Sequence, residues 1–403
     1  MRLNKLLLLG CLPFIITACS EEEIEKSGTG EKVNIELDVQ QRSIQKKSND
    51  FANQLMIHVA KENENVLISP LSLQVTLGML ANGANNETCN EIVTALGLKD
   101  YSLEELNEFH KIVMNGILNE QDPKVELALS NSMWMDKSLQ AGEGFKNSLK
   151  TYYSASFLNN VDFNNTDLAK NEINNWANKE TKGMIKDLQL PLTTSTKFVL
   201  SNACYFDGQW SSPFNTKNTF TEFFTTENGV AQKVPMMHKT AKRIYTNNDD
   251  YQLVVLDFGN KSFSMVVVLP QPGKTIAGII PSIDWSTSNV SHEVDVVLSL
   301  PKFKQEKLTK LNEILQGMGM ESLYESNSLS NISDNLSLSW AQQNTCFEID
   351  ESGVKTSTVT SANGLESSSG SIYEMTVNRP FLFAIRENST NTLMFMGKIA
   401  KIE

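Results

Sequence analysis

The apolar positions in the first half of the chain recur with a helical period. Phe51, Leu55 and Val59 lie about four residues apart, which is the spacing of the buried face of an amphipathic helix. The apolar run before Pro70 predicts a short strand, and the positions after it predict a helix that ends at Gly83, because proline suits the first helical turn and glycine its end. The first half of the chain is therefore expected to be mainly helical.

The second half is dominated by apolar runs of strand length. The stretches 197–206, 263–270 and 294–301 are mostly apolar and have high β propensity, as expected of strands that are covered on both faces. One more helix is expected around Ile173 and Ala177. Helices that precede strands in this way predict an α+β fold with several sheets. Because no repeat or interdomain linker interrupts the chain, we predict one large domain.

Composition and motifs narrow the possible functions. The chain has 403 residues, 40% of them hydrophobic, which is enough for a full core. Its net charge of −12 and the lack of a basic patch argue against a nucleic-acid partner. No Gly-x-Ser-x-Gly, His-Glu-x-x-His or Cys-x-x-Cys motif occurs, and the tripeptide 273–275 lacks the earlier glycine of a phosphate loop. We therefore predict no metal, no cofactor and no enzymatic activity.

Two further chemical possibilities follow from single residue types. Cys89, Cys204 and Cys346 are odd in number and lack paired spacing, which predicts free thiols rather than a disulfide framework. A hydrolase with a dispersed Ser-His-Asp triad stays an alternative, because the members of such triads have no fixed spacing in the sequence.

The N-terminal segment has the pattern of an export signal. Arg2 and Lys5 precede the apolar run 6–16, which is too short to span a bilayer. The run ends in Ile-Thr-Ala directly before Cys19, which resembles the lipobox of bacterial lipoproteins. In that motif the cysteine is acylated and becomes the new N-terminus, so we predict a lipid anchor at Cys19. An ordinary secretory signal with a chance cysteine is the alternative.

The export signal also predicts boundaries and a location. Residues 1–18 are expected to be a lipoprotein signal peptide, 19–40 a polar tether and 41–403 the folded domain. The acidic residues 21–23 resemble the tag that directs some Gram-negative lipoproteins to the cell surface. We therefore expect a protein that is anchored by lipid to the bacterial outer membrane and exposed at the surface, with a periplasmic orientation as the alternative.

Seven segments, taken in order, resemble the serpin family over about residues 45–402. These segments are NVLISPLSL (65–73), NWANKETKGMIKDL (175–188), SNACYFDGQW (201–210), VPMM (234–237), LPKF (300–303), NRPF (378–381) and FMGK (395–398). The resemblance implies three β-sheets, eight to nine helices and an exposed reactive loop at about 351–377 that a target protease cleaves.

The resemblance also assigns roles to individual residues. Ser69 and Asn202 would lie in the shutter, where the strands of the main sheet part, and Trp210 would lie at the breach, where the loop enters. Gln343 replaces a histidine that many members carry in the shutter. Its amide can donate and accept a hydrogen bond but cannot titrate, which argues against opening of the sheet by a change in pH. Ordinary core packing is the alternative role for these residues.

The first part of the reactive loop has the residue pattern that insertion into a sheet requires. The resemblance places the hinge at Glu351, Gly353, Val354, Thr356, Thr358 and Thr360. A strand that enters a covered sheet must turn small, uncharged side chains inward at every second position. From Val354 to Gly364 every second residue is small and uncharged, whereas Lys355 falls on the opposite face. The pattern favours an inserting loop over a polar loop that alternates by chance.

The cleaved bond follows from counting along the loop. If Gly353 is the fifteenth residue before the cut, the cleaved bond joins Ser367 and Ser368. Because the loop is slightly long, Leu365, Glu366 and Ser369 are alternatives for the residue that sets specificity. Serine at this position would suit proteases with small specificity pockets.

The function expected from the resemblance is inhibition of proteases by a suicide-substrate mechanism. A monomer would trap a serine endopeptidase, or a papain-like cysteine endopeptidase, as its acyl-enzyme while the loop inserts into the main sheet. The alternatives are a non-inhibitory serpin that acts as a binding module and a lipid-tethered surface adhesin.

Overall fold

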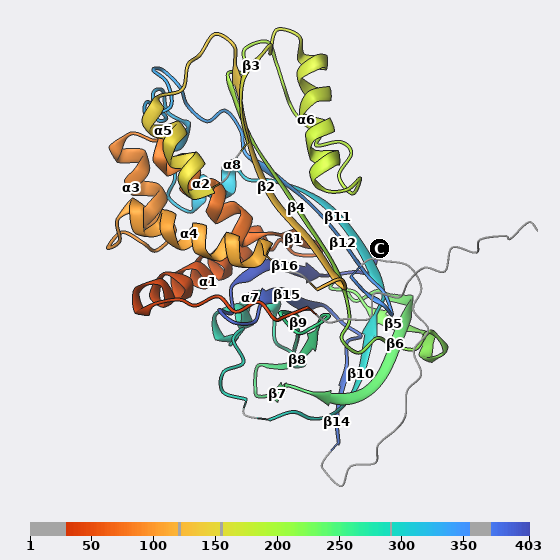
Figure 1. Ribbon diagram of the computed structural model, residues 1–403. Coiled ribbons are helices and arrows are strands. Elements are labelled where there is room, and N and C mark those ends of the chain that lie inside the picture. Colours follow the sequence, from red (N-terminus) through yellow and green to blue (C-terminus); the bar gives the residue numbers. More distant parts are fainter. Residues whose placement is uncertain (1–29, 120–121, 154–155, 291, 355–371) are drawn as a thin grey trace, which may run out of the picture.

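The computed structural model describes residues 30–119, 122–153, 156–290, 292–354 and 372–403 (Figure 1). Within these ranges it contains eight α-helices: α1 (Val39–Val59), α2 (Pro70–Gly83), α3 (Asn86–Ala95), α4 (Leu103–Leu118), α5 (Glu143–Ser148), α6 (Thr166–Glu180), α7 (Ile276–Ile279) and α8 (Asn312–Gly317). The strands are β1 (Val66–Ile68), β2 (Val125–Asp136), β3 (Ser156–Val161), β4 (Phe198–Gln209), β5 (Thr219–Thr225), β6 (Ala231–Arg243), β7 (Tyr245–Asn247), β8 (Tyr251–Asp257), β9 (Phe263–Pro270), β10 (Val294–Pro301), β11 (Phe303–Lys310), β12 (Gln342–Ile349), β13 (Gly353–Val354), β14 (Ile372–Thr376), β15 (Phe381–Glu387) and β16 (Leu393–Ile399).

The strands form three sheets. A large six-stranded sheet has the order β11-β12-β13-β4-β2-β3, a second has the order β1-β16-β15-β9-β8-β7, and a four-stranded sheet has the order β14-β10-β6-β5. Figure 1 shows helices α1 to α5 gathered on one side, whereas α6 lies by itself along the large sheet. The predicted α+β fold with three sheets and eight to nine helices is confirmed.

The apolar patterns explain where these elements lie. Helix α2 is buried on nearly every side, and all positions of β9, β15 and β16 are buried, so the second sheet is covered on both faces. Helix α6 is amphipathic instead, and its apolar side packs through Ile173 and Ala177 against Trp134 of β2 and Val199 of β4. The large sheet is therefore covered by one isolated helix on this face.

The N-terminal boundary differs from the one predicted. Residue 40, the expected end of the tether, lies within helix α1, which begins at Val39 behind the N-cap Asp38. Ile35 and Leu37 are buried, and Ile35 fills the space that a Cβ at Gly116 would need. The domain thus includes residues 30–38. The apolar residues of this segment alternate as in a strand, but the charged residues between them made it resemble a tether.

The described part of the chain bears on two further predictions. Cys89, Cys204 and Cys346 form no disulfide within the described residues; Cys204 is buried and the other two are half-buried. None of the described helices is long and apolar enough to cross a membrane. The predicted signal peptide and Cys19 lie outside the described residues.

Candidate functional site

The start of the predicted reactive loop is already a strand of the large sheet. Gly353 and Val354 form β13, in which Val354 pairs with Ile349 of β12 on one side and with Gly208 of β4 on the other. The Val354 side chain is 1% exposed, so it occupies the first inward position. Gly353 has a φ of +155°, and a Cβ there would lie 2.0 Å from the carbonyl oxygen of Gly208. Only glycine fits this approach of two backbones.

Beyond β13 the two central strands meet directly. Strands β4 and β12 are parallel and share a bridge between Asn344 and Ala203. By the same register Ile349 would face Gly208, which are the residues that Val354 separates. At one end of the seam between β4 and β12, the short strand β13 separates the two strands. Further along, at Asn344 and Ala203, the two strands pair directly. A longer insertion would have to part the strands at the Asn344 bridge.

Trp210 holds the turn from which β13 begins. Its backbone N–H donates to the carbonyl oxygen of Ser352 (2.8 Å), and its indole Nε1 donates to that of Asp350 (3.0 Å). The indole stacks on Phe258 with 4.6 Å between ring centroids and is 2% exposed. A rigid aromatic side chain thus lies beside the start of β13, and its assignment to the breach stays a prediction.

Glu351 joins the same turn to two other strands. Its carboxylate accepts a hydrogen bond from the hydroxyl of Thr219 and forms an ion pair with Lys302, each at 2.7 Å. Burial alone would raise the pKa of this carboxyl, but the hydrogen bonds from Lys302 and Thr219 outweigh it and hold the pKa below its ordinary value. The ion pair therefore connects the loop hinge with Lys302, which lies between the end of β10 and the start of β11.

Gln343 forms two hydrogen bonds with the backbone of Ser69, and the two residues were both assigned to the shutter by the family resemblance. The Ser69 N–H donates to its Oε1 (2.6 Å), and its Nε2 donates to the Ser69 carbonyl oxygen (3.0 Å). Ser69 Oγ in turn donates to the carbonyl oxygen of Met394 in β16 (2.7 Å). The amide thus ties β12 to the corner between β1 and α2, using both its donor and its acceptor. Asn202 lies in β4 opposite Asn131, and its side chain lies outside the described residues.

Sequence reasoning missed several contacts of this site. Thr345 Oγ1 donates to the Leu67 carbonyl oxygen (2.9 Å), which adds a second tie between β12 and β1. Lys302, the partner of Glu351, stands within the quoted LPKF segment, so its place in a motif was the one available signal. Thr219 had no signal, because nothing local marks a residue that contacts a partner 132 positions away.

The remaining predicted loop residues lie outside the described part of the chain. These residues are Thr356, Thr358, Thr360, Leu365, Glu366, Ser367, Ser368 and Ser369. The described ends of the loop are both in strands, since Gly353 and Val354 belong to the large sheet and residues 372–376 form β14, parallel to β10. Within the predicted loop of about 351–377, the segment between the two strands is 355–371.

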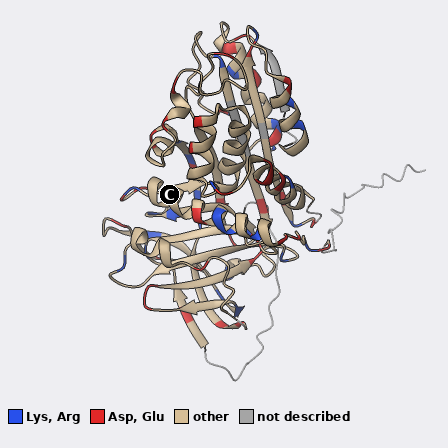
Figure 2. Ribbon diagram, turned by 90° about the vertical axis from the view of Figure 1, so that its left-hand side faces the viewer, with Lys and Arg blue, Asp and Glu red and all other residues tan. Residues whose placement is uncertain are grey.

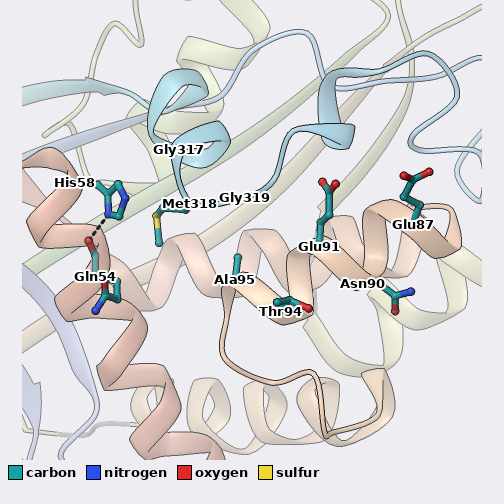
Figure 3. A pocket seen from close by; sticks show the side chains of 10 residues that line it. All are labelled: Gln54, His58, Glu87, Asn90, Glu91, Thr94, Ala95, Gly317, Met318 and Gly319. Atoms are coloured by element: carbon teal, nitrogen blue, oxygen red, sulfur yellow. Dashed lines mark hydrogen bonds between the residues drawn. The ribbon is translucent and has the colours of Figure 1, made fainter.

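A large surface cleft elsewhere on the molecule is chemically different from this site. It has a volume of about 830 Å³ and lies between α1, α3 and the end of α8 (Figure 3). His58 contacts the carbonyl oxygen of Gln54, while Glu87 and Glu91 project separately from α3. Within the described ranges no three His, Cys, Asp or Glu residues are placed to hold a metal ion. The hinge of the large sheet is therefore the better candidate for function.

Comparison with known proteins agrees with this geometry. The family model described as serpin (serine protease inhibitor) matches residues 46–402. An uncharacterized serpin-like protein of Thermococcus kodakarensis is 30% identical, over 89% of this chain and 86% of its own length. Human neuroserpin is 29% identical, over 84% of this chain and 86% of its own. The crystal structure of the thermophilic serpin tengpin in its native state superposes with a TM-score of 0.83 at 29% identity, covering 91% of this chain and 95% of that one.

Proposed function

This chain belongs to the serpin family, and on that premise we propose that it inhibits endopeptidases as a suicide substrate. The catalytic serine of the protease attacks the carbonyl carbon of the cleaved bond, forms an ester with the new C-terminus and releases the following segment as an amine. The loop then enters the large sheet between β4 and β12 and carries the protease with it. Distortion of the protease stops hydrolysis of the ester. A papain-like cysteine protease would form a thioester in the same way.

The observation that carries this proposal is the inward side chain of Val354 in β13. Because side chains alternate along a strand, continuation of β13 places Thr356, Thr358 and Thr360 on the same inward face. Their small, uncharged side chains can be buried under the covering helix α6 without leaving an unpaired charge. About a dozen new backbone hydrogen bonds at about 0.5–1.5 kcal/mol each supply a driving force on the order of 10 kcal/mol.

The cleaved bond and the location are part of the proposal. Cleavage at Ser367–Ser368 suits serine proteases with small pockets, while Leu365 or Glu366 would direct other proteases. A lipid at Cys19 holds the monomer at the bacterial outer membrane, facing outward, where it would meet foreign or released proteases. Mass spectrometry of the mature N-terminus should find an acylated cysteine at residue 19, and a free N-terminus beyond it contradicts this anchor.

A gel test separates inhibition from simple cleavage. The protein is mixed with elastase-like, trypsin-like and papain-like proteases, and we expect an SDS-resistant adduct with at least one of them. The same protease with its catalytic serine or cysteine blocked should form no adduct, because the ester or thioester needs that atom. Complete cleavage within 355–371 by all three classes without any adduct contradicts the inhibitor function.

A binding module is the second candidate, and one comparison favours it. The solved complex of thyroxine-binding globulin with thyroxine superposes on this chain with a TM-score of 0.78 at 26% identity. The same fold thus carries a small ligand in that protein. A carrier, like a surface adhesin, would be cut in its loop without retaining the protease. The gel therefore distinguishes both from the inhibitor.

A further inference from the structure

A cleft with an unusual arginine lies next to the breach. It has a volume of about 300 Å³ and lies where the end of β6 passes β8. Its wall includes Trp210 and the two serines that follow it, together with Asp257 at the end of β8. The cleft therefore shares the Trp210 side chain with the site at which the loop enters the large sheet.

The arginine is Arg243, the last residue of β6. Figure 2 shows most Lys and Arg residues of the described chain interspersed with Asp and Glu along the ribbon. Arg243 differs, because it is only 6% exposed and its Nε and Nη2 atoms are buried without a hydrogen-bond partner among the described residues. A buried guanidinium with unused donors is costly, since each donor has lost its water.

The neighbouring carboxylates of Asp257 and Glu293 favour the charged form of Arg243 but form no hydrogen bond with its Nε or Nη2 among the described residues. Asp257 forms its ion pair with Lys261, with 3.5 Å between Nζ and Oδ2. Glu293 also lines the cleft but is exposed, and no hydrogen bond joins it to the guanidinium among the described residues. Nε and Nη2 of Arg243 thus keep unused hydrogen-bond capacity at the cleft, although the charges of Asp257 and Glu293 act on the guanidinium.

Three more cations surround the same place. Lys242 and Lys261 line the cleft. Lys239 donates to Oγ of Ser212, a lining residue, and to the Pro213 carbonyl oxygen, both at 2.6 Å. Burial, and then the positive charge of Arg243, lower the pKa of Lys239 to about 8. Among the residues that line the cleft, the cations Lys242, Arg243 and Lys261 thus outnumber the carboxylates Asp257 and Glu293.

We propose that this cleft binds a small oxyanion, a carboxylate or a phosphate, on the guanidinium of Arg243. The planar fork of an arginine matches two oxygens of either group, and Lys242 and Lys261 add charge at the mouth. The volume corresponds to about ten water molecules, which admits a small di- or tricarboxylate but no folded partner. Because Trp210 forms part of the wall, a bound anion changes the surroundings of the indole at the breach.

The test uses citrate and inorganic phosphate as separate probes of the mature protein. Calorimetric titration at constant ionic strength, balanced with sodium chloride, should show saturable binding of at least one probe to one site. Tryptophan fluorescence should change with the same midpoint, and the melting temperature should rise by about 2–4 °C at saturation. A stronger response to citrate than to phosphate identifies carboxylate as the preferred group, and the reverse identifies phosphate.

Variants assign the site. Arg243→Met keeps the length of the side chain without the charge and should weaken binding by at least about ten-fold. Lys242→Gln with Lys261→Gln, two changes at more accessible positions, should weaken it by about three-fold or more even if Arg243→Met fails to fold. Glu293→Gln removes a competing carboxylate and should tighten binding, which damage to the fold would not do. Lys310→Gln, in β11 and outside the cleft, is the control and should bind as the parent does.

Three results overturn the proposal. One is the absence of saturable binding of either probe to the parent protein. The second is equal affinity of folded Arg243→Met and parent, and the third is an affinity that Glu293→Gln and the double lysine variant leave unchanged.

Discussion

The two edges of strand β4 are held in very different ways. On one side β4 pairs with β2 through eleven consecutive residues, from Val125 to Met135. On the other side its direct pairing with β12 is the bridge between Asn344 and Ala203, and two residues of β13 occupy the next stretch. Both edges belong to one buried sheet. Strand β4 is thus held by far more residue pairs on its β2 side than on its β12 side, so the β12 side is the one that should part more easily.

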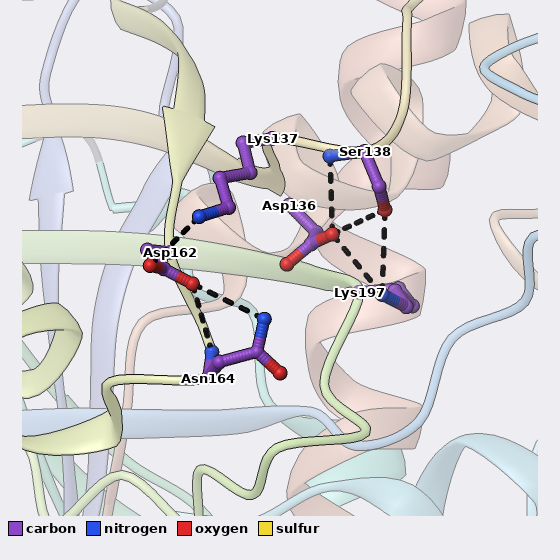
Figure 4. A network of polar contacts seen from close by, with 6 residues as sticks. All are labelled: Asp136, Lys137, Ser138, Asp162, Asn164 and Lys197. Atoms are coloured by element: carbon purple, nitrogen blue, oxygen red, sulfur yellow. Dashed lines mark hydrogen bonds and ion pairs between the residues drawn. The ribbon is translucent and has the colours of Figure 1, made fainter.

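Side chains reinforce the same difference. At the far end of the β2 edge, Lys197 pairs with Asp136 (3.0 Å) and Lys137 with Asp162 (2.8 Å), which fastens the starts and ends of β2, β3 and β4 to one another (Figure 4). At Asp136 burial alone would raise the pKa, but hydrogen bonds from Ser138 and Lys197 hold it below its ordinary value. The β12 edge depends instead on a few contacts to other elements, made by Gln343, Thr345 and the turn at Trp210.

The largest predicted effect tests whether the weak seam opens at all. Cleavage within 363–370 should let the loop enter between β4 and β12 and raise the melting temperature by about 20 °C or more, because insertion is driven by about 10 kcal/mol. Calorimetry of the cut and uncut protein measures this rise. An uncut sample treated with blocked protease is the control. A melting temperature that cleavage leaves unchanged means that the seam does not accept the loop.

The next effect concerns which face of the loop enters the seam. Thr356→Arg should force a guanidinium under α6, and a buried unpaired charge costs at least several kcal/mol. Insertion should slow, so that deacylation wins and the variant is cut at the parent bond but releases active protease. The stoichiometry of inhibition measures this change. Lys355→Ala, on the outward face, should inhibit nearly as the parent does, and a Thr356→Arg variant that traps protease with unchanged stoichiometry shows that the assigned face is wrong.

Whether a feature of the two edges of β4 could be predicted from the sequence depends on how far apart its contacting residues lie along the chain. The hydrophobic runs of β4, β9 and β10 and the helix after Pro70 were predictable, because a local apolar pattern determines them. Strand β13 was not, because two residues become a strand only when β4 and β12 lie on either side. The contact of Gln343 with Ser69 spans 274 positions and was expected only from family resemblance. Residues 30–38 carried a readable alternation that their charges obscured.

A smaller effect should appear at the ion pair that closes the hinge. Glu351→Gln removes the carboxylate that holds Lys302, and we expect the free energy of unfolding at pH 7 to fall by about 1–3 kcal/mol. Because the pKa of Glu351 is lowered in the folded protein, its contribution is present above the ordinary value of 4.5 and is lost as the pH falls through the folded value. The melting temperatures of the parent and the variant should therefore converge as the pH falls from 4.5 through the lowered pKa of the folded protein.

A matched substitution shows whether this effect belongs to the hinge. Glu306→Gln breaks an exposed ion pair with Lys304 in the same sheet, where both side chains are more than half exposed. Such a pair contributes at most about 1 kcal/mol, so this control should change stability little. Equal losses in the two variants would mean that the hinge pair has no special weight in keeping the seam closed.

The smallest predicted effect is a pH-dependent change in stability when Gln343, on the β12 side of the seam, is replaced by histidine. A neutral histidine also has one donor and one acceptor, so Gln343→His can keep the bridge to the Ser69 N–H and carbonyl oxygen. A protonated imidazole cannot accept the Ser69 N–H, and this loss lowers the pKa of the new histidine in the folded protein. Its contribution, about 1–2 kcal/mol, is therefore present above a pH of about 6.5 and is lost as the pH falls further.

Melting curves between pH 8 and 5 test this expectation against two references. The parent should show no step in this range from residue 343, because an amide does not titrate. Gln343→Asn, whose shorter amide reaches Ser69 less well, should be less stable at every pH and equally without a step. If the melting temperature of Gln343→His equals that of the parent at every pH between 8 and 5, the hydrogen bonds between residue 343 and Ser69 do not hold β12 in place. The closed part of the seam would then depend on Thr345 and on the Asn344 bridge alone.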